Sequence, residues 1–141
     1  LFEFLPDYWI AKNSNSNLDN FYHKAKEILR FVELFDELSS SEVEVFDYRI
    51  GERGNKLSGG QKQRLLLAQS LVKNKSIIII DEGLNALDED LESKILNKLL
   101  NLSELTLLYV SHRNKKHNGF NSQLNFEVNP KGGALATKEE L

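Results

Sequence analysis

The chain has 141 residues, of which 40% are hydrophobic and 28% are charged, an ordinary balance for one small globular domain. Its net charge of −3 gives no sign of the basic surface that nucleic-acid binding requires, and the absence of cysteine excludes disulfides and thiolate metal sites. No apolar run approaches the ~20 residues needed to cross a bilayer. The chain starts at Leu1 and contains no methionine, so we expect it to be a piece of a longer protein.

The first part of the chain is predicted to be mainly helical. An aromatic-rich start at 1–10 and a polar turn at 12–17 precede the stretch 18–38. Apolar residues in that stretch recur at three- and four-residue steps, which predicts an amphipathic helix, or two helices with a break. Residues 48–57 contain two glycines and are predicted to form a loop.

A second helix is predicted from Ser58 to Lys73. Ser58 and Gln61 have the spacing of a capping box, in which each side chain bonds a free backbone amide near the helix start. Asn74 is the predicted stop.

Strands and helices alternate after that point. The remaining predicted elements are a strand at 77–80, a helix capped by Asp88 and running through Leu100, strands at 106–110 and 123–128, a turn at 129–133 and a short helical end at 137–141. Because the first of these strands is a continuous β-branched run, we expect it to be buried on both faces of a parallel sheet. The sequence therefore predicts an α/β fold.

The start of the second helix has features of a phosphate site. The adjacent glycines Gly59 and Gly60 let another molecule approach the backbone closely, and Ser58 adds a hydroxyl donor. Free amides and the positive dipole end of a helix favour an anion such as phosphate. An ordinary capped helix after a glycine turn explains these residues equally well.

Polar residues also follow the two predicted buried strands. Asp81 and Glu82 end the run 77–80, and His112 follows the strand 106–110. Ligands bind open α/β sheets beyond the carboxyl ends of the strands, where one carboxylate can hold the water shell of Mg²⁺ and the other can polarise a water. The histidine can donate to a phosphate oxygen. The competing interpretations are an acidic turn and a structural loop histidine.

The order and spacing of these segments resemble the nucleotide-binding domain of ABC transporters. The segment 57–61 (LSGGQ) resembles the family's signature motif, and 77–82 (IIIIDE) resembles its Walker B motif. The segment 85–88 (NALD) resembles the D-loop, and His112 resembles the switch histidine. The segment 50–54 (IGERG) resembles the loop before the signature in exporters, and 1–2 resembles the segment after the Q-loop. The resemblance implies a P-loop NTPase-like ABC ATPase core, with a partial parallel sheet and flanking helices, plus a helical subdomain. Residues 1–56 would hold the tail of the Q-loop region and the helical subdomain, and 57–141 the signature helix and the C-terminal part of the core.

The resemblance also implies partners and residue roles. The γ-phosphate of ATP bound to a second, head-to-tail nucleotide-binding domain would be contacted by Ser58, Gly59, Gly60 and Gln61. Asp81 would support Mg²⁺ through water, and Glu82 would be the general base. Asp88 would couple the two ATP sites, and His112 would sense the γ-phosphate. Transmembrane domains would hold the chain at the cytoplasmic face of the plasma (inner) membrane. No nucleic-acid partner is expected.

Some family features are absent or altered. No G-x-x-x-x-G-K-[ST] loop occurs in the sequence, so the isolated chain is expected to show no ATP turnover. Gln69 stands where the family often has arginine, and 83–85 (GLN) replaces the more usual Ala-Thr-Ser. A soluble ABC ATPase acting on nucleic acid or ribosomes is the alternative function, and a non-catalytic interaction module is a third. Gln61 and the segment 52–54 favour the exporter.

Overall fold

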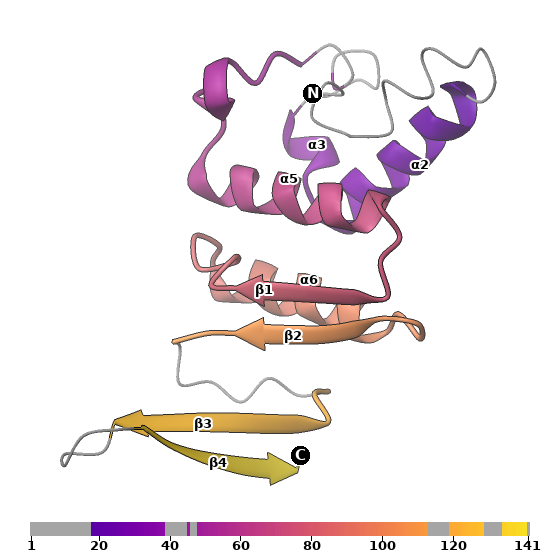
Figure 1. The fold of residues 1–141 in the computed structure, drawn as a ribbon. Helices are drawn as coiled ribbons and strands as arrows, with labels where there is room; N and C mark the ends of the chain where they lie inside the picture. The colour runs from indigo at the N-terminus through magenta and orange to yellow at the C-terminus, as the bar shows by residue number, and fades with distance from the viewer. Residues whose placement is uncertain (1–17, 39–44, 46–47, 113–118, 129–133, 141) are drawn as a thin grey trace.

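The computed structural model describes residues 18–38, 45, 48–112, 119–128 and 134–140 (Figure 1). Its elements in chain order are α2 (Leu18–Phe31), α3 (Phe35–Leu38), the 3-10 turn η2 (Glu52–Gly54), α5 (Gly59–Val72), β1 (Ile77–Asp81), α6 (Glu89–Leu100), β2 (Thr106–Val110), β3 (Ser122–Val128) and β4 (Ala134–Glu140). The features predicted at 1–17 and 129–133 lie outside the described residues.

The stretch 18–38 forms two helices rather than one. Glu33 adopts a left-handed conformation with φ 56°, which ends α2 and redirects the chain into α3. The Leu34 amide bonds back to the Leu29 carbonyl at 2.9 Å, and both side chains are fully buried. Of the two alternatives that the sequence left open, two helices with a break is therefore the one observed.

Helix α5 forms as the capping pattern predicts. Ser58 is its N-cap, Lys73 its C-cap, and Asn74 follows with φ 50°. Leu65, Leu67, Ala68 and Val72 are buried on its inner side, while Leu66 is 62% exposed. The described helices include none that is both long and apolar enough to span a bilayer.

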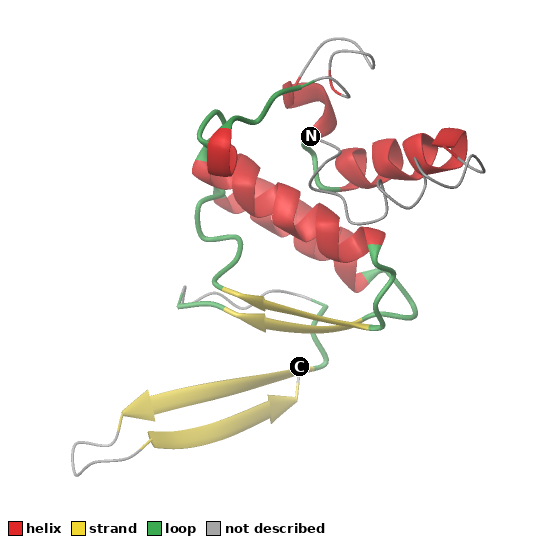
Figure 2. Ribbon diagram, turned by 45° about the horizontal axis from the view of Figure 1, so that its top comes forward, coloured by secondary structure: helices red, strands yellow, loops and turns green. Residues whose placement is uncertain are grey.

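Strands β1 and β2 form a parallel pair, in register from Ile77 opposite Thr106 to Asp81 opposite Val110. The described helices all lie on one side of this pair (Figure 2). Side chains alternate between faces, so Ile78 and Ile80 are each only 6% exposed, whereas Ile77 and Ile79 are 63% and 64% exposed.

The expectation that this strand is buried on both faces is therefore wrong for the described part of the chain. The helices supply a covering layer to one face, and nothing among the described residues covers the other. Leu108 and Val110 of β2 are also exposed, at 50% and 39%.

Helix α6 packs its apolar side against the same core. Asp88 caps it by accepting from the Leu91 amide at 2.9 Å, as predicted. Ile95, Leu96 and Leu99 are at most 1% exposed. The core thus lies between α5, α6 and the inner face of β1 and β2.

Strands β3 and β4 form a separate antiparallel hairpin that is not hydrogen-bonded to β1 and β2. The strand predicted at 123–128 is confirmed, but the helical end predicted at 137–141 is wrong, since Ala134–Glu140 is strand β4. A five-residue helix cannot offset its nucleation cost, whereas pairing with β3 satisfies the same backbone groups. A stacked contact between Tyr109 of β2 and Phe120, with ring centroids 6.2 Å apart, packs the segment before the hairpin against β2.

Candidate functional site

The start of α5 presents an exposed tip made of Ser58, Gly59 and Gly60. The capping box is complete: the Gln61 amide donates to Ser58 Oγ at 3.1 Å, and the Ser58 amide donates to Gln61 Oε1 at 3.0 Å. Ser58 and Gly59 are exposed and Gly60 is partly exposed. The tip therefore offers a helix N-terminus that a second molecule can reach.

The Gln61 side chain is committed to holding this tip in shape. Besides the capping bond, its Nε2 donates to Glu37 Oε2 of α3 at 3.4 Å. In this conformation it supports the helix start rather than extending toward an incoming ligand.

Glu82 and His112 meet at the carboxyl ends of β1 and β2. Parallel pairing places the two strand ends at one edge, and the Glu82 amide continues the ladder by donating to the Val110 carbonyl at 3.0 Å. His112 Nε2 lies 2.5 Å from Glu82 Oε1, and Asn85 Nδ2 donates to Glu82 Oε2 at 3.0 Å. Glu82 has φ 51°, which turns its side chain out of the strand.

Both partners of this pair remain accessible. The Glu82 side chain is 46% exposed and the His112 side chain 80% exposed. An ionised carboxylate offers about four lone-pair positions, so Glu82 can still accept a hydrogen bond from a water while His112 and Asn85 hold it. The arrangement can orient and polarise such a water.

Asp81 is not part of the Glu82–His112 pair. It ends β1 on the same face as Ile77 and Ile79, the face that no described element covers, and it is exposed.

The carboxylates of the site can be compared with the ligands that Mg²⁺ requires. The described residues contain no cluster of three or more metal-ligating side chains, so they form no all-protein cage. Mg²⁺ usually keeps several waters and binds one or two carboxylates together with phosphate oxygens, a mode that the exposed Asp81 carboxylate fits.

The turn between β1 and α6 packs directly on the tip of α5. In Figure 1 this turn rises from the arrowhead of β1 toward the start of α5. A Cβ built on Gly60 would lie 2.8 Å from Leu87 Cδ2 and 3.2 Å from the Ala86 carbonyl oxygen. Gly60 is therefore required here for the close approach of two segments of the same chain, a reason that the sequence alone did not separate from ligand access.

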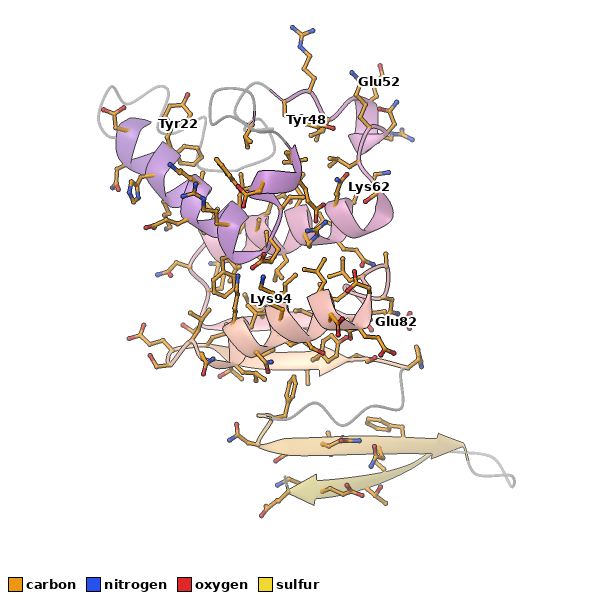
Figure 3. The ribbon with its side chains drawn as sticks, turned by 180° about the vertical axis from the view of Figure 1, so that it is seen from behind. Tyr22, Tyr48, Glu52, Lys62, Glu82 and Lys94 are labelled. Atoms are coloured by element: carbon orange, nitrogen blue, oxygen red, sulfur yellow. The ribbon has the colours of Figure 1, made fainter. Side chains whose placement is uncertain are left out.

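A shallow pocket of about 300 Å³ opens beside this junction. Its lining consists of Glu37, Ser58, Gly59, Gly60, Arg64, Ala86, Leu87, Asp88 and Leu91. Of the predicted site residues, Asp88 thus lies with the tip, while Glu82 and His112 form a pair at the strand ends. Figure 3 shows Glu82 and Lys62, which is next to the tip, toward the same side of the molecule.

Two residues behind the tip, Arg64 and Glu37, were not predicted as part of the site. Arg64 is 3% exposed; its guanidinium donates to Glu37 Oε1 at 2.7 Å and Oε2 at 2.5 Å, and also to the carbonyls of Glu33 and Gly60. The hydrogen bonds from Arg64 hold the pKa of Glu37 below its ordinary value of 4.5, against a smaller opposing effect of burial.

The network ties the tip to the 18–38 segment, because Arg64 belongs to α5 and Glu37 to α3. The available signal in the sequence was a charged residue four positions after Gly60, on the side of α5 that carries buried Leu65 and Ala68. A buried arginine requires acceptors, but which carboxylate supplies them depends on the tertiary fold.

A second ionic cluster joins α2 to α6. Lys98 Nζ lies 2.5 Å from Glu33 Oε1 and donates to the Phe31 carbonyl at 2.9 Å, and Lys94 Nζ lies 3.0 Å from Glu33 Oε2. The hydrogen bond from Lys98 is the main cause of the lowered pKa of Glu33. This cluster fixes the end of α2 on the core that carries β1 and β2.

Comparison with known proteins places these features in a family. The chain is 49% identical over 79 residues to the ABC transporter ATP-binding protein YwjA of Bacillus subtilis (strain 168), itself uncharacterized; the match covers 55% of this chain and 14% of that protein. It is 40% identical over 91 residues to the ATP-dependent lipid A-core flippase of Haemophilus influenzae, covering 64% of this chain and 14% of the flippase.

A third relative, the lactococcin-G-processing and transport ATP-binding protein LagD of Lactococcus lactis subsp. lactis, is 45% identical over 67 residues, 48% of this chain and 10% of that protein. The matched part of the chain thus spans only 10–14% of the length of these relatives. The sequence model of the family described as ABC transporter matches residues 3–85, more than half of the chain. The chain belongs to the ABC transporter family.

Proposed function

We propose that this chain is the C-terminal portion of the ATP-binding and ATP-hydrolysing domain of an ABC exporter. The observation that carries the proposal is the accessible Glu82–His112 pair at the strand ends, together with the exposed serine-glycine tip of α5. The named relatives include a lipid A-core flippase and a bacteriocin transport protein, which favours export over other uses of ATP.

The proposed reaction is attack of water on the γ-phosphate of ATP. Glu82 acts as the general base: its carboxylate orients the water and accepts its proton, while Asn85 and His112 hold the two carboxylate oxygens. His112 also senses the γ-phosphate through its accessible imidazole. Positioning and electrostatic stabilisation supply most of the rate in phosphoryl transfer, so the fixed geometry of Glu82 matters more than its basicity.

The tip serves a different ATP molecule. Ser58 and the free amides of Gly59 and Gly60 present a positive helix end to the γ-phosphate held by a second nucleotide-binding domain, arranged head to tail, and Gln61 holds this helix start in shape through the capping box. Asp88, which lines the pocket beside the tip, couples the two sites. Asp81 would support Mg²⁺ through its water shell, and the ion would neutralise developing phosphate charge.

The remaining parts of the proposal concern assembly. Residues 1–56 form the tail of the Q-loop region and the helical subdomain, and 57–141 the signature helix and C-terminal core. Transmembrane domains of the exporter anchor the assembly at the cytoplasmic face of the plasma (inner) membrane. Because the sequence contains no phosphate-binding G-x-x-x-x-G-K-[ST] loop, residues 1–141 alone should not hydrolyse ATP.

The decisive experiment is Glu82→Gln in the protein that carries this chain. We expect ATP hydrolysis to be lost while ATP-driven dimerisation, measured by size-exclusion chromatography with light scattering, is retained, since the amide keeps the shape but not the base. The matched control is Glu104→Gln, which makes the same change at an exposed position beside the opposite ends of the strands. Hydrolysis that persists in Glu82→Gln would refute the assigned role.

A further inference from the structure

The 83–88 turn lies between the tip of α5 and the Glu82–His112 pair. On one side it packs on the tip of α5 through Ala86 and Leu87. On the other side Asn85 holds the Glu82 carboxylate at 3.0 Å. Any displacement of this turn would therefore alter the direction of the Glu82 side chain.

A side chain of α5 fixes the centre of this turn. The Asn85 and Leu87 amides donate within the turn, to the carbonyls of Glu82 at 3.2 Å and Leu84 at 3.0 Å. The Ala86 amide between them instead donates to Gln63 Oε1 at 2.9 Å, across 23 positions of sequence.

The position of Gln63 on α5 suits this task. It lies one helical turn after Gly59 and Gly60, so its side chain falls on the side of the helix where those glycines meet Ala86 and Leu87. The turn is thus held at two points, by the close contact with Gly60 and by the hydrogen bond from the Ala86 amide to Gln63. Gln63 is only partly buried, which makes the bond breakable without opening a core cavity.

We propose that Gln63 is a positioning residue, which holds the 83–88 turn against the tip of α5 and through Asn85 sets the direction of the Glu82 carboxylate. The series of contacts runs from Gln63 through Ala86 and Asn85 to Glu82 and then His112. Its catalytic consequence rests on the proposed function, in which Glu82 belongs to one ATP site and the tip to the other. Gln63 then mechanically links the two sites within one chain.

The test uses three variants of the protein that carries this chain. Gln63→Leu removes the acceptor, and Gln63→Glu keeps an oxygen acceptor for the Ala86 amide. The matched control is Gln69→Leu, the same change at a partly buried position farther along α5. Glutamine, glutamate and leucine have similar helix propensities, so α5 itself should be unaffected.

The first measurement is hydrogen exchange at the Ala86 amide, which does not depend on ATP. We expect Gln63→Leu to speed exchange about fivefold, the factor that corresponds to one typical neutral hydrogen bond, with Gln63→Glu and Gln69→Leu close to wild type. Unchanged exchange in Gln63→Leu would overturn the positioning role.

The second measurement is steady-state ATP hydrolysis with kcat and KM resolved. We expect kcat of Gln63→Leu to fall about fivefold with KM for ATP and Tm nearly unchanged, and Gln63→Glu to restore most of kcat. Equal losses in the Leu and Glu variants, or a faster-exchanging turn with normal kcat, would refute the link to Glu82. If the wild-type protein does not hydrolyse ATP, the proposed function fails. The exchange measurement then still tests whether Gln63 holds the Ala86 amide.

Discussion

Gly60→Ala tests whether the tip of α5 and the 83–88 turn are packed as closely as the structure shows. The new Cβ would lie 2.8 Å from Leu87 Cδ2 and 3.2 Å from the Ala86 carbonyl oxygen. Leu87 is 5% exposed, so its side chain has little room to move, and the carbonyl is backbone. Overpacking of this kind costs about 1–3 kcal/mol.

An opposing effect must be subtracted. Replacing glycine by alanine in a helix stabilises by about 0.5–1 kcal/mol, and less in the first turn. The net expectation for Gly60→Ala is a loss of about 1–2 kcal/mol. In a chain of this size that corresponds to a fall in Tm of about 3–8 °C.

Gly59→Ala provides the matched control. A Cβ there meets only Ala86 Cβ, at 3.4 Å, which is ordinary van der Waals contact. This variant should be neutral or slightly stabilised. Both Tm values are measured by differential scanning calorimetry, and equal values for the two variants would refute the close packing argued for Gly60.

Three further predictions concern the ionic clusters. Arg64→Met should destabilise the fold by about 2–3 kcal/mol in urea denaturation, because the Glu33 and Gly60 carbonyls lose a donor. Glu37→Gln should cost a similar amount, about 2–3 kcal/mol, because it leaves the buried Arg64 charge without its carboxylate; an effect below about 0.5 kcal/mol in both variants would contradict the network. The pKa values of Glu33 and Glu37 are lowered from 4.5 in the folded chain, so the unfolded chain binds more protons as pH falls below about 4.5. Their stabilisation should be complete above that pH and lost below it, and the double Gln variant should show a flatter urea midpoint between pH 6 and 3. Lys98→Met should cost about 1 kcal/mol by the same assay, with the difference from wild type shrinking in 1 M salt; a salt-independent difference would argue against the ionic contact with Glu33.

The local chemistry of the chain explains which parts of the fold were predictable. The Ser58–Gln61 capping box, the Asp88 cap and the strands at 77–80 and 106–110 depend on neighbouring residues and hydrophobic pattern, and all are present. Pattern alone did not reveal how β1 is covered, since a β-branched run is compatible with one or two covering layers. The helical end predicted at 137–141 failed because pairing with β3 competes with short-range helix propensity.

The candidate site divides in the same way. The sequence predicted that Asp81, Glu82 and His112 follow parallel strands, and the structure brings Glu82 and His112 into contact. The sequence could not predict the hydrogen bonds from Asn85 to Glu82 and from the Ala86 amide to Gln63, because these bonds depend on how α5 crosses the strand ends. The roles assigned to all the predicted site residues remain predictions: Ser58, Gly59, Gly60, Gln61, Asp81, Glu82, Asp88 and His112.

The uncovered face of β1 and β2 affects how this chain would behave in solution. Ile77, Ile79 and Leu108 expose half or more of their surface there, and in the described part of the chain β1 has a hydrogen-bonded neighbour on only one side. Apolar strands with an open edge are templates for pairing between molecules. Residues 1–141 prepared alone are therefore prone to aggregate through β1.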